Sequence, residues 1–242
     1  AQQSPPVPEK YEIFFDHYVD KRSYSETILN QVGLTNDSIG RSFALIAGIS
    51  HYPNMPITER DLKPASEDIE KMTIILKTYE YFDEIVVLKN EYVTYNNLSF
   101  FLQTYFPKRL KKFPKSRFLF AYSGHGVSVG TNGYILLGAA KSYSNLEESI
   151  NLKVIRILFD EVVESGHHVL ALLNTCYSGA FIQRPFGNSH YIPKYRGSHV
   201  ITAGGSRELT WHDPEVGSGS IFFEKVIAAL NGHADMIPSG GD

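Results

Sequence analysis

The feature that most constrains the fold of this chain is a series of short, almost continuously apolar segments that alternate with amphipathic stretches. Five such segments lie at 42–48, 84–88, 117–123, 168–173 and 199–203. Apolar runs of this length are typical of strands in a mostly parallel sheet that is covered on both faces. The sequence therefore predicts an α/β sandwich, with a mostly parallel central sheet between two layers of helices.

The stretches between these segments have apolar residues at helical spacing. The sequence predicts a helix entered at Pro64, helices over 94–106, 152–163 and 221–230, and a short hairpin strand over 133–137. A basic run, Lys108, Arg109, Lys111 and Lys112, is expected to be the solvated end of a helix. No internal repeat at solenoid or propeller spacing is found.

The first 40 residues differ from the rest of the chain. Residues 1–10 are polar and rich in proline, whereas the apolar residues of 11–19 fall near helical spacing. We therefore expect an N-terminal extension over 1–40, in part a helical arm packed on the main domain, and one large domain over 41–242.

Composition and charge argue against several classes of function. The 23 basic and 26 acidic residues leave a formal net charge of −3, so we expect no binding to nucleic acid or to a membrane surface. No stretch reaches the roughly 18 to 20 apolar residues needed to cross a bilayer. The chain begins at Ala1 rather than Met, so both removal of a signal peptide and a fragment of a longer chain stay open. We favour the cytoplasm and keep export as the alternative.

The chain contains a single cysteine, Cys176, which excludes an internal disulfide and a multi-cysteine metal site. An isolated cysteine is more often a small buried hydrophobe than a reactive thiol. His167 and His168 have no other ligand type nearby in the sequence, so we expect no metal and no cofactor.

Two of the predicted strands end close to residues that can carry chemistry. Segment 117–123 is followed by His125 between two glycines, and segment 168–173 is followed by Cys176. If these strands are neighbours in a parallel sheet, His125 and Cys176 face each other at one edge. An imidazole raises the thiolate fraction of a cysteine or takes its proton during attack. The backbone N–H groups of Gly126 and Cys176 are the expected donors to an oxyanion.

Four segments match, in order, four blocks of the caspase and metacaspase superfamily. They are LKPASEDIEKM (62–72), AYSGHG (121–126), LLNTCYSGA (172–180) and GSIFFEKVIAAL (219–230). His125 and Cys176 are 51 positions apart, and about 50 residues separate the catalytic His and Cys of caspases. The chain therefore resembles this superfamily from about residue 42 to residue 230.

The resemblance implies a caspase-like three-layer sandwich and a cysteine endopeptidase that cleaves a protein or peptide substrate. It implies that Cys176 attacks the peptide carbonyl and that His125 protonates the departing amine, with no third catalytic residue required. An activating partner or subunit is a further candidate. Two other readings stay open, namely a catalytically silent caspase-fold interaction module and another thiol hydrolase such as an amidase. The retained His and Cys pair speaks against the first, and segment 219–230 speaks against the second.

The resemblance also bears on specificity. Caspases hold the Asp before the scissile bond with two Arg and one Gln, but those positions correspond to Leu62, Asn174 and Pro214, which do not pair with a carboxylate. Metacaspases hold Arg or Lys with acidic residues, of which Asp68 matches one, while Asn174 replaces another and Glu208 is a candidate support. We therefore expect cleavage after Arg or Lys, with a small or uncharged residue as the alternative.

Residues 181–198 have no periodicity and are expected to form a long loop. In members of the family, activation cleavage or a loop rearrangement occurs in this region. The resemblance therefore makes Arg184, Lys194 and Arg196 candidate sites of self-cleavage. Trp211 follows the last predicted strand, and it is expected either in the core or in the wall of the substrate pocket.

Overall fold

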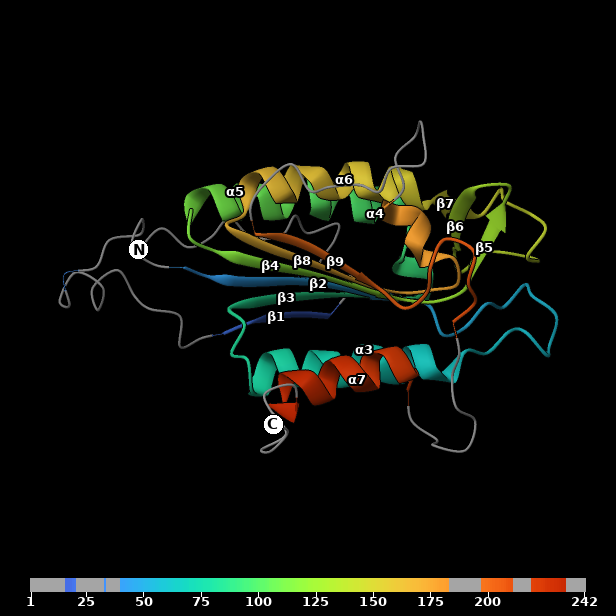
Figure 1. Ribbon diagram of the computed structural model, residues 1–242, viewed down its shortest axis with the longest axis horizontal. Coiled ribbons are helices and arrows are strands. Elements are labelled where there is room, and N and C mark those ends of the chain that lie inside the picture. The colour runs from blue at the N-terminus through green and yellow to red at the C-terminus, as the bar shows by residue number, and fades with distance from the viewer. Residues whose placement is uncertain (1–15, 21–32, 34–39, 183–196, 211–218, 234–242) are drawn as a thin grey trace, which may run out of the picture.

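The computed structural model describes residues 16–20, 33, 40–182, 197–210 and 219–233. In these residues a six-stranded sheet lies between two layers of helices, as a three-layer α/β sandwich (Figure 1). The strand order is β1-β3-β2-β4-β8-β9, and every neighbouring pair is parallel except β1 and β3. The strands are β1 (Asp16–Val19), β2 (Ser42–Gly48), β3 (Glu84–Lys89), β4 (Arg117–Ser123), β8 (His168–Asn174) and β9 (Ser198–Thr202).

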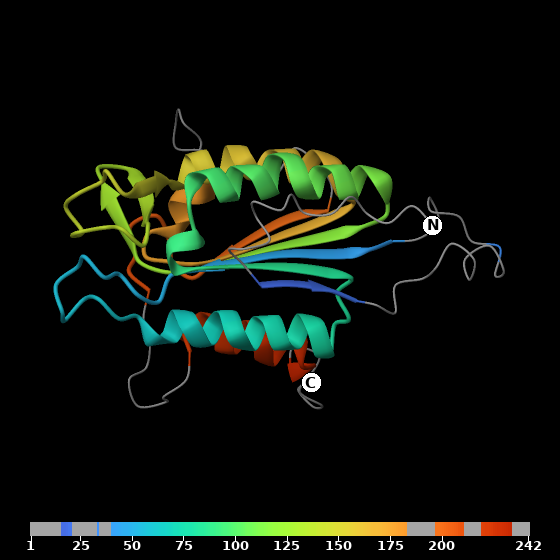
Figure 2. The same cartoon turned by 180° about the vertical axis from the view of Figure 1, so that it is seen from behind.

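The helices cover both faces of this sheet, and Figure 2 shows the same arrangement from behind. One face carries α4 (Tyr95–Ser99), the π-helical segment η3 (Phe100–Tyr105), α5 (Phe106–Lys112) and α6 (Leu152–Ser165). The other face carries α3 (Lys63–Thr78) and α7 (Ile221–Leu230). The shorter elements are η2 (Asn90–Tyr92), β5 (Gly126–Val129), β6 (Asn132–Leu136), β7 (Ser149–Asn151) and η4 (Ser178–Ile182). None of the helices in the described ranges is long and apolar enough to cross a membrane.

Local signals place the helix starts. A proline stands in the first turn of α3, where its missing N–H costs nothing. The side chains of Thr94, Asn151 and Ser220 accept backbone N–H groups at the starts of α4, α6 and α7. The helix expected over 94–106 continues to Lys112, because Pro107 falls in the first turn of α5 rather than ending the helix.

The central strands are buried on both faces, which explains their continuous apolar sequence. In β2 the side chains of Phe43, Leu45 and Ala47 belong to the core cluster beneath α4, α5 and α6. Ala44 and Ile46 belong to the second cluster, beneath α3 and α7. The sheet therefore has two cores, and the prediction of a mostly parallel sheet covered on both faces is confirmed.

The N-terminal segment does not have the expected helical conformation where it is described. Residues 16–19 form β1, an edge strand antiparallel to β3. Its side chains use the two faces of the sheet in turn: His17 contacts Glu84, whereas Tyr18 packs against the second core cluster and lies under the ammonium group of Lys77. Successive side chains point to opposite faces only in a strand, so the pairing with β3 overrides the helical spacing of the apolar residues in this segment.

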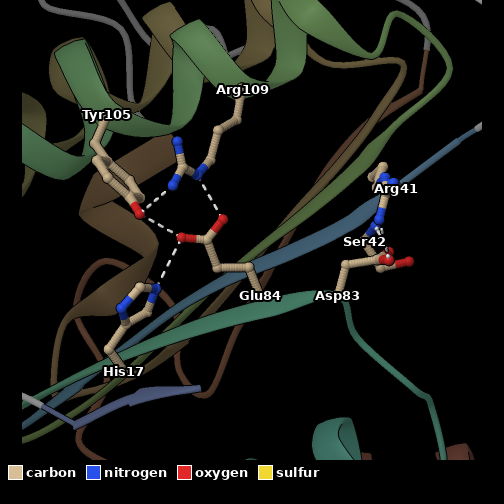
Figure 3. A network of polar contacts seen from close by, with 7 residues as sticks. All are labelled: His17, Arg41, Ser42, Asp83, Glu84, Tyr105 and Arg109. Atoms are coloured by element: carbon tan, nitrogen blue, oxygen red, sulfur yellow. Dashed lines mark hydrogen bonds and ion pairs between the residues drawn. The ribbon is translucent and has the colours of Figure 1, made fainter. Parts of the chain in front are cut away.

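The basic run in α5, from Lys108 to Lys112, is likewise only partly exposed to solvent. Arg109 is 5% exposed and its guanidinium pairs with Glu84, which is 4% exposed (Figure 3). Tyr105 donates a hydrogen bond to the same carboxylate, and His17 contacts it at 2.9 Å between Nε2 and Oε1. The expectation of a solvated helix end is therefore wrong for Arg109, whereas Lys108 is exposed.

This network determines the protonation of Glu84. Burial alone raises the pKa of a carboxyl group, but the hydrogen bonds from His17, Arg109 and Tyr105 and the charge of Arg109 outweigh it. The pKa of Glu84 is therefore lowered, and the group is a carboxylate at neutral pH. Its contribution to stability is present above the ordinary Glu pKa and is lost as the pH falls through the lowered value.

We expect Arg109→Met to lower the free energy of unfolding by about 3–5 kcal/mol, because it leaves the buried carboxylate of Glu84 without its cation. The matched control is Lys108→Met, one position away and exposed, for which a change below about 0.5 kcal/mol is expected. Urea denaturation followed by circular dichroism measures both. Equal effects of the two substitutions would contradict the structural role of the network.

Candidate active site

His125 and Cys176 lie at the same edge of the sheet. Strands β4 and β8 are parallel neighbours, with Ser123 paired to Asn174, and each of the two candidate residues lies two positions beyond that pair. The backbone extends the pairing by one more bond, from the N–H of Gly124 to the carbonyl of Asn174 at 3.2 Å. The expectation that the two strands are neighbours is therefore confirmed.

Both residues line one cavity of about 500 Å³ at this end of the sandwich. Its wall comes from the start of α3, the ends of β4 and β8, strand β5, the segment between β6 and β7, the segment after β9, and the cap of α7. No Asp, Glu, Lys or Arg of the described residues contributes to this wall. The lining residues are Leu62, Pro64, Ala65, Ser123, Gly124, His125, Gly126, Val127, Ser128, Tyr143, Asn174, Cys176, Tyr177, Leu209, Thr210 and Ser220.

Tyrosines hold His125 at two points. Its backbone N–H donates to the hydroxyl of Tyr52 at 2.8 Å, and the two rings lie with their centroids 4.8 Å apart. Tyr52 is completely buried, and burial raises the pKa of its hydroxyl, which therefore stays protonated. The hydroxyl of Tyr143 lies 3.4 Å from Nε2 of His125. Neither tyrosine could be predicted from the sequence, because neither belongs to a motif that contains His125.

Cys176 is partly exposed and lies in a turn with an unusual backbone. Its Sγ is 3.5 Å from the backbone nitrogen of Thr210 and 3.6 Å from the Thr210 hydroxyl. Tyr177, the next residue, has a φ of 61°, and its N–H donates to the carbonyl of Glu208. A non-glycine residue in this left-handed region is strained, and such strain is common at functional sites. The segment 204–210 thus holds the turn and places an N–H beside the sulfur.

Gly126 packs directly against the turn that contains Cys176. A Cβ atom on Gly126 would lie 2.2 Å from Oγ1 of Thr175 and 2.5 Å from the carbonyl oxygen of Cys176. The same atom would lie 3.3 Å from the backbone nitrogen of Cys176. The two residues expected to provide the oxyanion donors are therefore in contact, and glycine is needed here because of the close approach.

The predicted substrate residues are only partly brought together. Asp68 is 1% exposed and lies behind the cavity wall. Its Oδ2 accepts hydrogen bonds from Ser123 Oγ at 2.7 Å and Asn174 Nδ2 at 3.0 Å, and its Oδ1 accepts one from the N–H of Ser220 at 2.7 Å. These three partners line the cavity. One carboxyl group thus joins α3, β4, β8 and α7.

The environment of Asp68 also affects its protonation. Burial raises its pKa, and the hydrogen bonds from Ser220, Ser123 and Asn174 offset only part of this effect. Glu208 is exposed, and its carboxylate accepts the N–H of Gly205 at 2.7 Å, so it does not belong to the described cavity wall.

Several expectations fall on residues that the structure does not describe. Trp211, Pro214 and the candidate cleavage sites Arg184, Lys194 and Arg196 lie outside the described ranges. The loop expected over 181–198 is wrong at both ends, because Phe181 and Ile182 belong to η4, with Phe181 fully buried, and Ser198 belongs to β9. Residues 183–196 lie outside the described ranges. Within the described residues no group of three or more His, Cys, Asp or Glu side chains could hold a metal ion.

Comparison with known proteins agrees with this geometry. The sequence model of the family described as "Caspase domain" matches residues 41–239. The chain belongs to the caspase domain family. A comparison with curated protein sequences found no match.

The fold of this family member is also seen in a solved structure. The crystal structure of caspase-1 from Spodoptera frugiperda is similar, with a TM-score of 0.56 at 16% sequence identity. The likeness covers 79% of this chain and 69% of that one. At this identity the match supports the caspase fold, and the family itself is one of cysteine peptidases.

We expect Gly126→Ala to lower the free energy of unfolding by about 1–3 kcal/mol, because the added methyl group would overlap Thr175 and the backbone of Cys176. Gly138→Ala is the matched control, since a Cβ there meets no atom closer than 3.4 Å. Urea denaturation compares the two variants. A Gly126 variant as stable as the Gly138 variant would show that the turn is not tightly packed.

Proposed function

We propose that this caspase family member is a cysteine endopeptidase in which Cys176 is the nucleophile and His125 is the acid and base. The observation that carries the proposal is that the two residues leave adjacent parallel strands at the same register and line the same cavity. A thiol and an imidazole that line the same cavity are the groups that nucleophilic acyl transfer requires.

In the proposed reaction, His125 accepts the thiol proton and the sulfur of Cys176 attacks the peptide carbonyl carbon. The N–H groups of Gly126 and Cys176 bind the resulting oxyanion. The imidazolium then protonates the departing amine as the carbon–nitrogen bond breaks, which leaves a thioester. His125 next removes a proton from water, which attacks the thioester and releases the carboxylic acid product and the thiol.

The segment after β9 supports the same chemistry. The N–H of Thr210 is directed at Sγ of Cys176 at 3.5 Å, which helps to hold the sulfur in the cavity wall. The sequence contains no motif for this contact.

For specificity we propose Arg or Lys before the scissile bond, with Asp68 as the source of negative charge. Asn174 already donates through its amide nitrogen to Asp68 and Ser123, so its amide oxygen is the atom that would accept from a substrate cation. The full burial of Asp68 favours the alternative, a small or uncharged residue, because a bulky cation would have to reach a carboxyl group behind the wall.

We expect Cys176→Ala to abolish hydrolysis of fluorogenic peptides with little effect on stability, and His125→Ala to slow it by about a hundredfold or more. The measurement is kcat/KM for each variant, with the melting temperature recorded for each. Full turnover by the Cys176 variant would refute the proposed nucleophile. Absence of turnover in the wild type on every peptide would favour the silent interaction module.

The specificity prediction uses peptides that differ only before the scissile bond. We expect the wild type to cleave Arg and Lys peptides with a kcat/KM at least about tenfold above that for Asp, Ala or Leu, the worth of one charge-assisted hydrogen bond. Asp68→Asn should lose this preference selectively. Equal loss on every peptide would assign Asp68 a purely structural role, and faster cleavage after Ala or Leu by the wild type would establish the alternative.

A further inference from the structure

We propose that the hydroxyl of Tyr143 is a positioning residue for His125, which holds the imidazole and stabilises its protonated form. The inference rests on the proposed Cys and His pair and adds a third side chain to it. The sequence resemblance required no third residue, so this role arises from the geometry alone.

The contact is specific in position and angle. Tyr143 lies in the segment between β6 and β7 and lines the cavity with His125. Its ring meets the imidazole edge-on, with centroids 5.4 Å apart and planes at 80°. Its hydroxyl is 3.4 Å from Nε2, a long hydrogen bond of the kind that shortens when a catalytic site binds substrate.

A hydroxyl can serve both protonation states of the imidazole. The imidazolium carries an N–H on each ring nitrogen, so Nε2 then donates to the oxygen of Tyr143. In the neutral tautomer with its proton on Nε2, this atom still donates to Tyr143 and Nδ1 can accept a proton. In the other tautomer, with the proton on Nδ1, the hydroxyl reverses its role and donates to Nε2. A phenol that stays neutral is required for this reversal. Burial, Glu59 and Cys176 all raise the pKa of Tyr143, so it is protonated throughout the neutral range.

Among the described residues, groups from at least three segments face His125. Tyr52 packs against the ring from the segment before α3, Tyr143 contacts Nε2 from the segment before β7, and Cys176 lies across the cavity. The negative charge of Glu59 raises the pKa of Tyr143. The described cavity wall has no Asp or Glu, so its contribution at Nε2 is a neutral hydroxyl. Such a partner stabilises the imidazolium less strongly than a carboxylate does.

The test measures the alkylation rate of Cys176 by iodoacetamide from pH 5 to pH 10 in the full chain. Cys176 is the single cysteine, so the signal has one source. In wild type a thiolate paired with imidazolium should give a reactive limb at neutral pH. Tyr143→Phe keeps the ring and removes the hydroxyl, so the neutral limb should fall by about tenfold, the worth of a hydrogen bond to a charged group.

The rate near pH 10 should be unchanged in this variant, because the thiol there is ionised without help from the imidazole. Loss of structure would also remove the neutral limb, so the melting temperature of the variant is recorded and should match that of wild type. Tyr143 is 38% exposed, which favours a folded variant, and Tyr143→Leu should reproduce the result. Tyr95→Phe, on an exposed tyrosine outside the cavity, is the control and should match wild type at every pH.

The outcomes separate this inference from the proposed function. If His125→Ala removes the neutral limb and Tyr143→Phe does not change it, the role of Tyr143 is refuted and the Cys and His pair stands. If His125→Ala leaves the profile unchanged, no thiolate–imidazolium pair exists and the role of Tyr143 is refuted. The proposed function is refuted separately, if His125→Ala also cleaves peptides as fast as wild type. On peptides, Tyr143→Phe should lower kcat by about tenfold with KM little changed, since the hydroxyl acts through His125 rather than on the substrate.

Discussion

The parallel pairing of β4 with β8 is the constraint on which the site depends. It places Ser123 opposite Asn174, so that the next residues of both strands leave the sheet side by side. A shift of one position would turn every side chain of the shifted strand to the opposite face and separate the thiol from the imidazole. The buried side chains on both faces of these strands, such as Phe120 and Leu172, fix this register. The pairing of β4 with β8 therefore determines both the packing of the core and the positions of His125 and Cys176.

Much of this arrangement could be predicted from the sequence because it is local or strongly patterned. Continuous apolar runs identified β2, β3, β4, β8 and β9, and the residues at the ends of β4 and β8 identified His125 and Cys176. The supporting residues could not be found in this way. Tyr52, Tyr143 and Thr210 come from segments with no periodicity, and only the folded chain brings them to the site.

The errors have a common physical cause. Arg109 was expected in water and residues 16–19 in a helix, and both expectations fail at the same place. The Glu84 carboxylate, on β3 next to the edge strand β1, pairs with Arg109 from α5 and contacts His17 from β1. A buried charge needs partners wherever the chain can supply them, and this requirement overrides the preferences of short segments. Charge pairing of this kind is not visible in a pattern of hydrophobicity.

The hydrogen bonds of Asp68 affect the order in which the molecule assembles. Its three partners are 55, 106 and 152 positions away along the chain. Contacts between such distant residues require the closure of long loops, whose entropic cost delays their formation during folding. The back of the cavity is thus complete only after α7 has docked on a finished sheet. A chain in which α7 has not yet docked would have both the cysteine and the histidine strand, but Asp68 would lack the N–H of Ser220 and the back wall of the cavity would be incomplete.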